Sequence, residues 1–169
     1  MYPILEKRLL AEGIWLMKVL APRVARSARP GQFIIVRADE HGERIPLTIS
    51  DFDAEEGSVT IVTQAIGAST RKICSLEAGE AFADFAGPLG HPSEFVEMPL
   101  DELRKRHYLF VAGGVGTAPV YPQVKWLKEH GVKATLHIYP SGGHGWGMNP
   151  KFRYYDDWQK ATLDWLSTL

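Results

Sequence analysis

The chain has 169 residues, 45% of them hydrophobic, which is enough for one domain or two small ones. Nineteen basic residues stand against 20 acidic ones, and no run of lysine and arginine is longer than 104–106, so the sequence argues against a nucleic-acid partner. The single cysteine, Cys74, excludes a disulfide within the chain and a Cys-rich metal cluster. No apolar run reaches the roughly 18 residues of a membrane span, and the N-terminus lacks a signal-peptide core, so we expect a cytoplasmic protein with no membrane partner.

Residues 1–97 have the pattern of an antiparallel β-barrel. Three apolar stretches rich in Ile and Val predict strands: 13–22, 32–38 and 57–67. In the last of these, alternation places Val59, Ile61 and Thr63 on one face. Loops rich in Pro, Gly and Asp separate the strands, and 69–80 is a helix-compatible insert. Short strands at this spacing indicate an antiparallel barrel or sandwich.

Residues 98–169 predict a second, smaller α/β domain. The expected elements are a strand at 107–113, a helix at 120–131, a strand at 133–139 and a helix at 154–169. The first three form one parallel β-α-β unit, because parallel strands need a crossover connection. The apolar residues of the last helix lie mostly along one face, which predicts that this helix packs against the rest of the domain.

A glycine-rich turn joins the first predicted strand of this domain to its helix. Glycines at positions 113, 114 and 116 would let the backbone approach a ligand closely and would aim free N–H groups at an anion. The turn departs from the G-x-G-x-x-G pattern, because Pro119 stands in the place of the last glycine. A tight structural turn between strand and helix is an equally good interpretation of the motif alone.

The stretch 107–131 resembles the start of the nicotinamide-binding domain of ferredoxin–NADP reductase-type flavoproteins. More narrowly, it is similar to the electron-transfer subunit of dihydroorotate dehydrogenase and to the small subunit of NADH-dependent ferredoxin–NADP oxidoreductase. Four motifs carry the resemblance in the order expected of the flavin barrel: "ARPGQFIIVR", "RIPLTIS", "IGAST" and "GPLGHPS". The resemblance covers about residues 1–133.

The resemblance implies FAD as the cofactor and an NAD(P)H site beside it. The candidate cofactor-binding residues are Arg44, Pro46, Leu47, Thr48, Ser50, Gly67, Ser69, Thr70, Gly113, Gly114 and Gly116. Hydroxyls and amides at a glycine turn suit a diphosphate, and a flat apolar wall with a few polar groups suits the flavin ring. The family has an arginine where Ile45 stands, with Arg44 one position earlier. Taken singly, "RIPLTIS" could be a polar edge strand and "IGAST" a helix N-cap that uses Ser69.

The second domain is short for this family. Its nicotinamide domain has several further β-α units, so a complete nicotinamide pocket is not expected here. The related electron-transfer subunits end in a cysteine cluster that holds a [2Fe–2S] centre. Since no cysteine follows Cys74, we expect no iron–sulfur cluster on this chain.

The last part of the chain, 131–169, resembles the final strand, histidine loop and helix of α/β-hydrolases of the acetyl- and xylan-esterase type. His144 stands where those enzymes keep their catalytic base. No G-x-S-x-G nucleophile elbow occurs in the chain, and Ser141 lies only three residues from His144. The sequence thus has the pattern of a chimera of two α/β proteins, and hydrolase activity is not expected.

Three functional interpretations follow, in order of preference. The first is a flavoprotein that moves electrons between NAD(P)H and a redox partner through FAD. The second is a chimeric or designed protein without catalysis, which keeps at most nucleotide affinity. The third is an esterase remnant that lacks its nucleophile. A short second domain buries little surface alone, which favours a homodimer.

Overall fold

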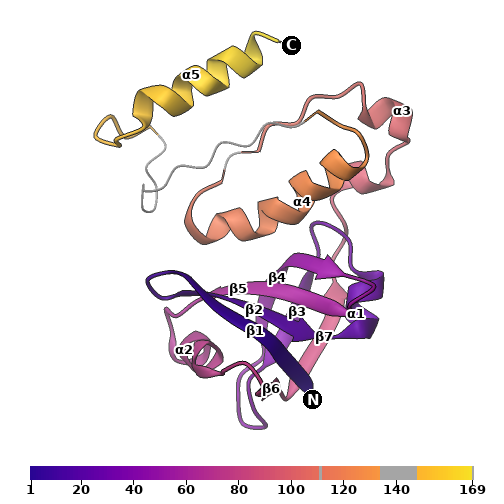
Figure 1. The fold of residues 1–169 in the computed structure, drawn as a ribbon, viewed down its shortest axis with the longest axis vertical. Helices are drawn as coiled ribbons and strands as arrows, with labels where there is room; N and C mark the ends of the chain where they lie inside the picture. The colour runs from indigo at the N-terminus through magenta and orange to yellow at the C-terminus, as the bar shows by residue number, and fades with distance from the viewer. Residues whose placement is uncertain (111, 134–147, 169) are drawn as a thin grey trace.

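The computed structural model describes residues 1–110, 112–133 and 148–168, and its main body is an antiparallel β-barrel (Figure 1). The strands are β1 Tyr2–Ala11, β2 Ile14–Leu20, β3 Phe33–Arg37, β4 Ile45–Asp53, β5 Ser58–Gln64, β6 Ala81–Phe82 and β7 Asp84–Leu89. Their order in the sheet is β6-β1-β2-β5-β4-β3-β7, with every neighbouring pair antiparallel. Because β6 runs into β7 through Ala83, the two ends of the sheet meet and the barrel is nearly closed. The predicted barrel is confirmed.

The predicted strands at 13–22, 32–38 and 57–67 are confirmed as β2, β3 and β5. On β5, the side chains of Val59, Ile61 and Thr63 are all buried, as the alternation predicts. Across the ladder, Met17 pairs with Ile61, and both side chains are fully buried. These inward positions form the barrel core.

The helices and turns lie around and beyond this barrel. They are α1 Pro22–Ser27, α2 Ala68–Ser75, α3 Leu100–Leu103, α4 Thr117–Glu129 and α5 Tyr155–Leu166, with 3-10 turns η1 Glu94–Glu97 and η2 Gly114–Gly116. The insert predicted at 69–80 is a helix, but it ends at Ser75, and Gly79 lies in the following turn. Figure 1 shows α4 lying across one side of the barrel, and α5 apart from the barrel.

The helix predicted at 120–131 is α4, which begins three residues earlier, at Thr117. Its end is the one expected from the sequence. Gly131 has φ of +77°, a conformation that favours glycine, and Val132 N donates to Leu127 O at 3.0 Å. This hydrogen bond to one of the last carbonyl groups of α4 is that of a Schellman motif, which ends the helix.

The parallel β-α-β unit is not confirmed. Residues 107–110 and 112–113 form no strand, so the prediction at 107–113 is wrong for the residues that the structure describes. Most of the strand predicted at 133–139 lies outside the described residues. The apolar run at 107–110 instead contributes ring contacts: Phe95 meets the rings of Tyr108 and Phe110 at 5.6 and 6.4 Å.

The C-terminal helix is confirmed as α5, but its predicted packing is not. No residue of α5 is fully buried and Leu163 is 64% exposed, whereas Trp158 and Trp165 are half-buried. The Trp165 ring meets the His107 ring edge-on, with their centroids 6.3 Å apart. The amphipathic pattern therefore predicted the helix correctly, and Trp165 is one of its apolar residues with a contact in the second domain.

Two hydrophobic clusters stabilise the described chain. The larger is the barrel core, and the smaller consists of Phe95, Leu103, Leu127 and Val132. Polar contacts join α4 to the barrel side: Lys125 Nζ donates to Asp51 Oδ1 at 2.8 Å.

A domain boundary near residue 97 stays a prediction. None of the described helices is both long enough and apolar enough to cross a membrane.

Candidate functional site

The turn between β5 and α2 is built by Thr70. The amides of Ile66 and Gly67 donate to Thr70 Oγ1 at 3.1 and 2.9 Å, and Thr70 Oγ1 donates in turn to Gly67 O at 3.2 Å. This is one half of a capping box: the side chain of the N3 residue, Thr70, accepts from the backbone of the N-cap residue, Gly67, which has no side chain to return the contact. The Thr70 hydroxyl therefore shapes the turn, and the amides that follow Gly67 open the first turn of α2.

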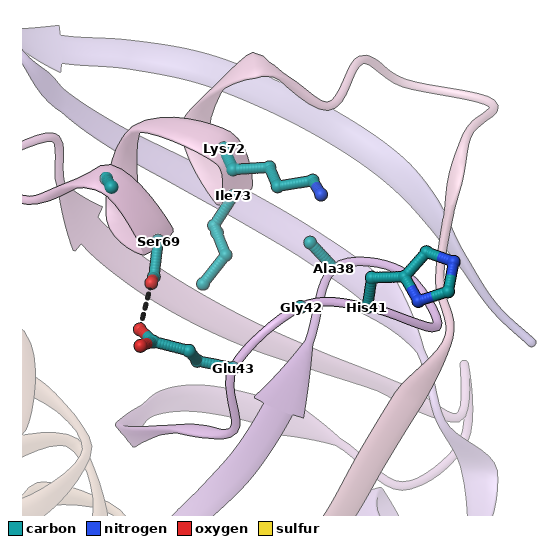
Figure 2. Close-up of a pocket in the computed structure, with 8 residues that line it drawn as sticks. Ala38, His41, Gly42, Glu43, Ser69, Lys72 and Ile73 are labelled. Carbon is teal, nitrogen blue, oxygen red and sulfur yellow. Dashed lines mark hydrogen bonds between the residues drawn. The ribbon is translucent and has the colours of Figure 1, made fainter.

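A pocket of about 170 Å³ lies at this helix end (Figure 2). Its lining residues come from the loop after β3 and from α2: Ala38, His41, Gly42, Glu43, Ala68, Ser69, Lys72 and Ile73. The Ser69 hydroxyl donates to Glu43 Oε2 across the pocket. Of the predicted residues, the structure thus brings Ser69 to the pocket, with Gly67 and Thr70 forming the turn beside it.

The one lysine that lines the pocket is paired with a carboxylate beside it. Lys72 Nζ forms an ion pair with Asp39 Oδ2. Lys72 and the hydrogen bonds from the backbone amides of His41 and Gly42 hold the pKa of the Asp39 carboxyl below its usual value. The helix dipole and the Lys72 ammonium make this pocket suitable for an anion, whereas Glu43 opposes one.

Alternation along β4 separates two sets of predicted residues. Leu47 packs against the barrel core beside Ile45, whereas Pro46 is exposed and Thr48 is half-buried. Successive side chains of a strand point to opposite faces, so Pro46 and Thr48 share the outer face. Leu47 was expected on the same wall, and the structure places its side chain on the other side of the strand.

Ser50 lies at a β-bulge. The β4–β5 register shifts between Ile49 and Asp51, and both Ile49 and Ser50 are buried. Ser50 is 4% exposed, and its hydroxyl has no hydrogen-bond partner within the described part of the chain. A buried hydroxyl without a partner costs free energy, and a ligand would reach this one only after the atoms that cover it move.

Arg44 points away from the pocket. Its Nη2 donates to Asp84 Oδ2 of β7 at 3.0 Å, and its side chain is 67% exposed. It does not line the pocket beside Ser69. A contact between Arg44 and a phosphate therefore stays a prediction, and it requires Arg44 to leave Asp84.

The second glycine motif lies next to the barrel. The turn η2 is close to β5, and α4 packs against β4. Gly114 has φ of +56°, which favours glycine, while Gly113 is extended. A Cβ added at Gly114 or Gly116 would meet no atom of the described chain within 4 Å. The backbone of this turn is therefore accessible on the side where a side chain would project.

Three polar lining residues of the pocket were not predicted from the sequence: His41, Glu43 and Lys72. Asp39, which pairs with Lys72 beside the pocket, was not predicted either. The stretch "DEHGER" was interpreted only as a hairpin loop. Lys72 could have been found, because it stands three residues after Ser69 on the same helix and so shares its face. Across the described residues, no group of three His, Cys, Asp or Glu side chains could hold a metal ion.

Comparison with curated proteins finds relatives for most of the chain, although no family model matches it. An uncharacterized protein from the adh 3′ region of Clostridium beijerinckii is 57% identical over 132 residues. The dihydroorotate dehydrogenase B (NAD⁺) electron transfer subunit homolog of Thermotoga maritima is 39% identical over 132 residues. Both alignments cover 78% of this chain, but only 45% and 44% of those proteins, so the chain spans less than half of their length.

Solved structures agree with these relatives. The NADH-dependent reduced ferredoxin–NADP oxidoreductase, described in the context of flavin-based electron bifurcation, matches with a TM-score of 0.69 and 38% identity. The match covers 78% of this chain and 45% of that one. Phthalate dioxygenase reductase matches with a TM-score of 0.61 at 21% identity over 78% of this chain and 40% of that one, which shows a shared fold alone.

The resemblance predicted for residues 1–133 is confirmed: the named relatives are electron-transfer subunits and reductases of the predicted kind. The hydrolase resemblance of 131–169 finds no support in them. The dihydroorotate dehydrogenase B electron transfer subunit of Fusobacterium nucleatum aligns over 163 residues, 95% of this chain and 59% of that subunit, at 27% identity. That alignment extends into the segment attributed to an esterase. His144 and Ser141 lie outside the described residues.

Proposed function

We propose that this chain binds FAD on its barrel and transfers electrons between NAD(P)H and a redox partner. The observation that carries the proposal is the pocket at the N-terminus of α2, which joins the predicted glycine turn to the loop before "RIPLTIS". The identity of 38–39% to an electron transfer subunit homolog and to a ferredoxin–NADP oxidoreductase supports it.

The described residues fit the two ends of a flavin dinucleotide. For the diphosphate, the pocket offers the first-turn amides of α2, the Ser69 hydroxyl and the Lys72 ammonium. For the ring system, β4 offers the outer face of Pro46 and Thr48, and the predicted role of Ser50 requires the atoms that bury its hydroxyl to move aside. Bound FAD would supply the redox chemistry, taking up a hydride and releasing electrons. The chain's own residues would bind and orient it.

The nicotinamide nucleotide is assigned to the glycine turn that precedes α4. Gly114 and Gly116 leave space beside the backbone of the turn that begins at Gly113, and the turn lies close to β5. The N-terminus of α4 would favour a phosphate there. We expect this site to bind the nicotinamide nucleotide less tightly than the flavin site binds FAD. A dinucleotide normally lies across the edge of a large parallel sheet, and the described segment supplies only one helix of such a domain.

The partner in this proposal is a redox protein, in keeping with relatives that are named electron transfer subunits. Association into a homodimer and a cytoplasmic location are further parts of the proposal. The absence of an iron–sulfur cluster on this chain stays a prediction from its single cysteine.

A second candidate is a chain that binds a nucleotide without catalysis. One observation favours it: residues 107–110 form no strand. In this account the chain is chimeric or designed and keeps at most nucleotide affinity. The esterase remnant rests on His144 alone and needs a nucleophile that the sequence lacks.

Thermal unfolding with added FAD tests the main proposal. A ligand that binds only the folded state raises its stability by RT ln(1 + [L]/Kd), about 2.7 kcal/mol at a hundredfold excess over Kd. The melting temperature should therefore rise with FAD concentration and should respond less to riboflavin, which lacks the diphosphate. A melting temperature that ignores excess FAD would contradict the proposal.

A further inference from the structure

The carboxylate of Glu43 occupies the part of the pocket that an anionic ligand would use. Ser69 Oγ donates to Glu43 Oε2, and Figure 2 shows the two side chains pointing toward each other across the pocket. Ser69 belongs to the first turn of α2, where backbone amides lack intrahelical partners and the helix dipole favours a negative charge. In the free protein, a side-chain carboxylate supplies that charge.

This contact is suited to exchange. Glu43 is exposed, and its contact with Ser69 is its one side-chain hydrogen bond within the described residues. The neighbouring charges already have partners, since Arg44 pairs with Asp84 and Lys72 pairs with Asp39. An exposed carboxylate held by one hydroxyl is displaced at low cost, because exposed polar contacts contribute little to stability.

We propose that the Glu43 carboxylate competes with the ligand at the flavin site, an inference that rests on the proposed function. A ligand that carries a diphosphate must displace Glu43 from Ser69. The same residue then selects between ligands. A flavin with phosphates meets the negative charge of Glu43 at the helix end, whereas a flavin without phosphates does not reach it. Glu43 therefore weakens the binding of FAD and leaves that of riboflavin unchanged.

The Glu43→Gln variant removes the charge and keeps the size of the side chain. Like-charge repulsion near a helix N-terminus is modest and screened by salt, so Glu43→Gln should bind FAD about two- to fivefold more tightly at low ionic strength. The difference should shrink as salt is added. The matched control is Glu40→Gln, an exposed glutamate of the same loop that does not line the pocket.

The experiment measures the Kd of FAD and of riboflavin by flavin fluorescence for the wild type, Glu43→Gln and Glu40→Gln. Tighter FAD binding in Glu43→Gln alone, with equal riboflavin binding in all three proteins, supports the inference. Equal or weaker FAD binding in Glu43→Gln overturns the inference and leaves the proposed function standing. No FAD binding to any of the three overturns both. If Glu43→Gln folds poorly, Glu43→Ala replaces it with the same expected outcomes.

Discussion

The hydroxyl of Thr70 holds the backbone of Gly67 in place, accepting a hydrogen bond from Gly67 N at 2.9 Å and donating to Gly67 O at 3.2 Å. This reciprocal contact sets the direction in which the first amides of α2 point. Those amides form one wall of the pocket that also contains Ser69 and Lys72. A local capping contact thus positions the proposed diphosphate site.

Replacing Thr70 with valine should reduce the stability of the protein and its affinity for FAD together. Loss of a capping side chain costs roughly 1 kcal/mol of the free energy of unfolding, and the amides of Ile66 and Gly67 lose their acceptor. Chemical denaturation and an FAD titration would measure the two effects. Thr70→Ser keeps the hydroxyl and should retain most of both. A Thr70→Val protein as stable as the wild type would show that the cap does not stabilise α2.

Replacing Lys72 with glutamine should weaken FAD binding and reduce its dependence on salt. Lys72 is the cationic side chain among the described lining residues, and a phosphate contact through lysine is screened by ions. Arg71→Gln removes the neighbouring positive charge, which does not line the pocket, and serves as the control. Equal losses of affinity in both variants would indicate a general effect of net charge and not a contact in the pocket.

Two buried serines should respond in opposite ways to alanine. Ser50 Oγ has no described partner, so Ser50→Ala should leave the free energy of unfolding unchanged or raise it by up to about 1 kcal/mol. Ser58 Oγ donates to Glu56 Oε2 at 2.6 Å, so Ser58→Ala should lower it by about 1 kcal/mol. If Ser50 contacts the flavin, Ser50→Ala should also weaken FAD binding, whereas Ser58→Ala should not. Destabilisation by Ser50→Ala would reveal a partner for its hydroxyl.

The ion pair of Asp39 and Lys72 should contribute to the acid sensitivity of the protein. Because the pKa of Asp39 is lower in the folded protein, its contribution to stability is present above the ordinary value for an aspartate, about 3.9, and is lost as the pH falls through the folded value. Asp39→Asn should therefore show a shallower loss of stability below about pH 4. Unfolding curves across this pH range test it, with the exposed carboxylate variant Asp164→Asn as control. Parallel pH profiles for Asp39→Asn and the wild type would contradict it.

The sequence predicted the parts of the fold that depend on local periodicity. Strand β5 could be located because Val59, Ile61 and Thr63 alternate toward the core, and the end of α4 because Gly131 takes a conformation that favours glycine. Strand β1 was missed, because Ile4 is its one fully buried residue and most of its other residues are exposed, so the strand shows no apolar alternation. Tertiary pairing with β2 and β6 makes that segment a strand.

The candidate site could be predicted only in part for the same reason. The turn of Gly67, Ser69 and Thr70 is local and was found from its motif. Glu43 reaches Ser69 from 26 positions earlier in the chain, a proximity that depends on barrel closure and not on spacing. Arg44 and Leu47 belong to a matching motif, yet the ion pair with Asp84 and the alternation of β4 turn their side chains elsewhere.

Equilibrium binding of FAD to the purified wild-type chain tests the central claim most directly. The account predicts saturable binding of one FAD per chain, weakened by Lys72→Gln and not by Arg71→Gln, with riboflavin binding more weakly than FAD. A chain that shows no saturable FAD binding, or that binds riboflavin as tightly as FAD, would contradict a diphosphate site at the N-terminus of α2.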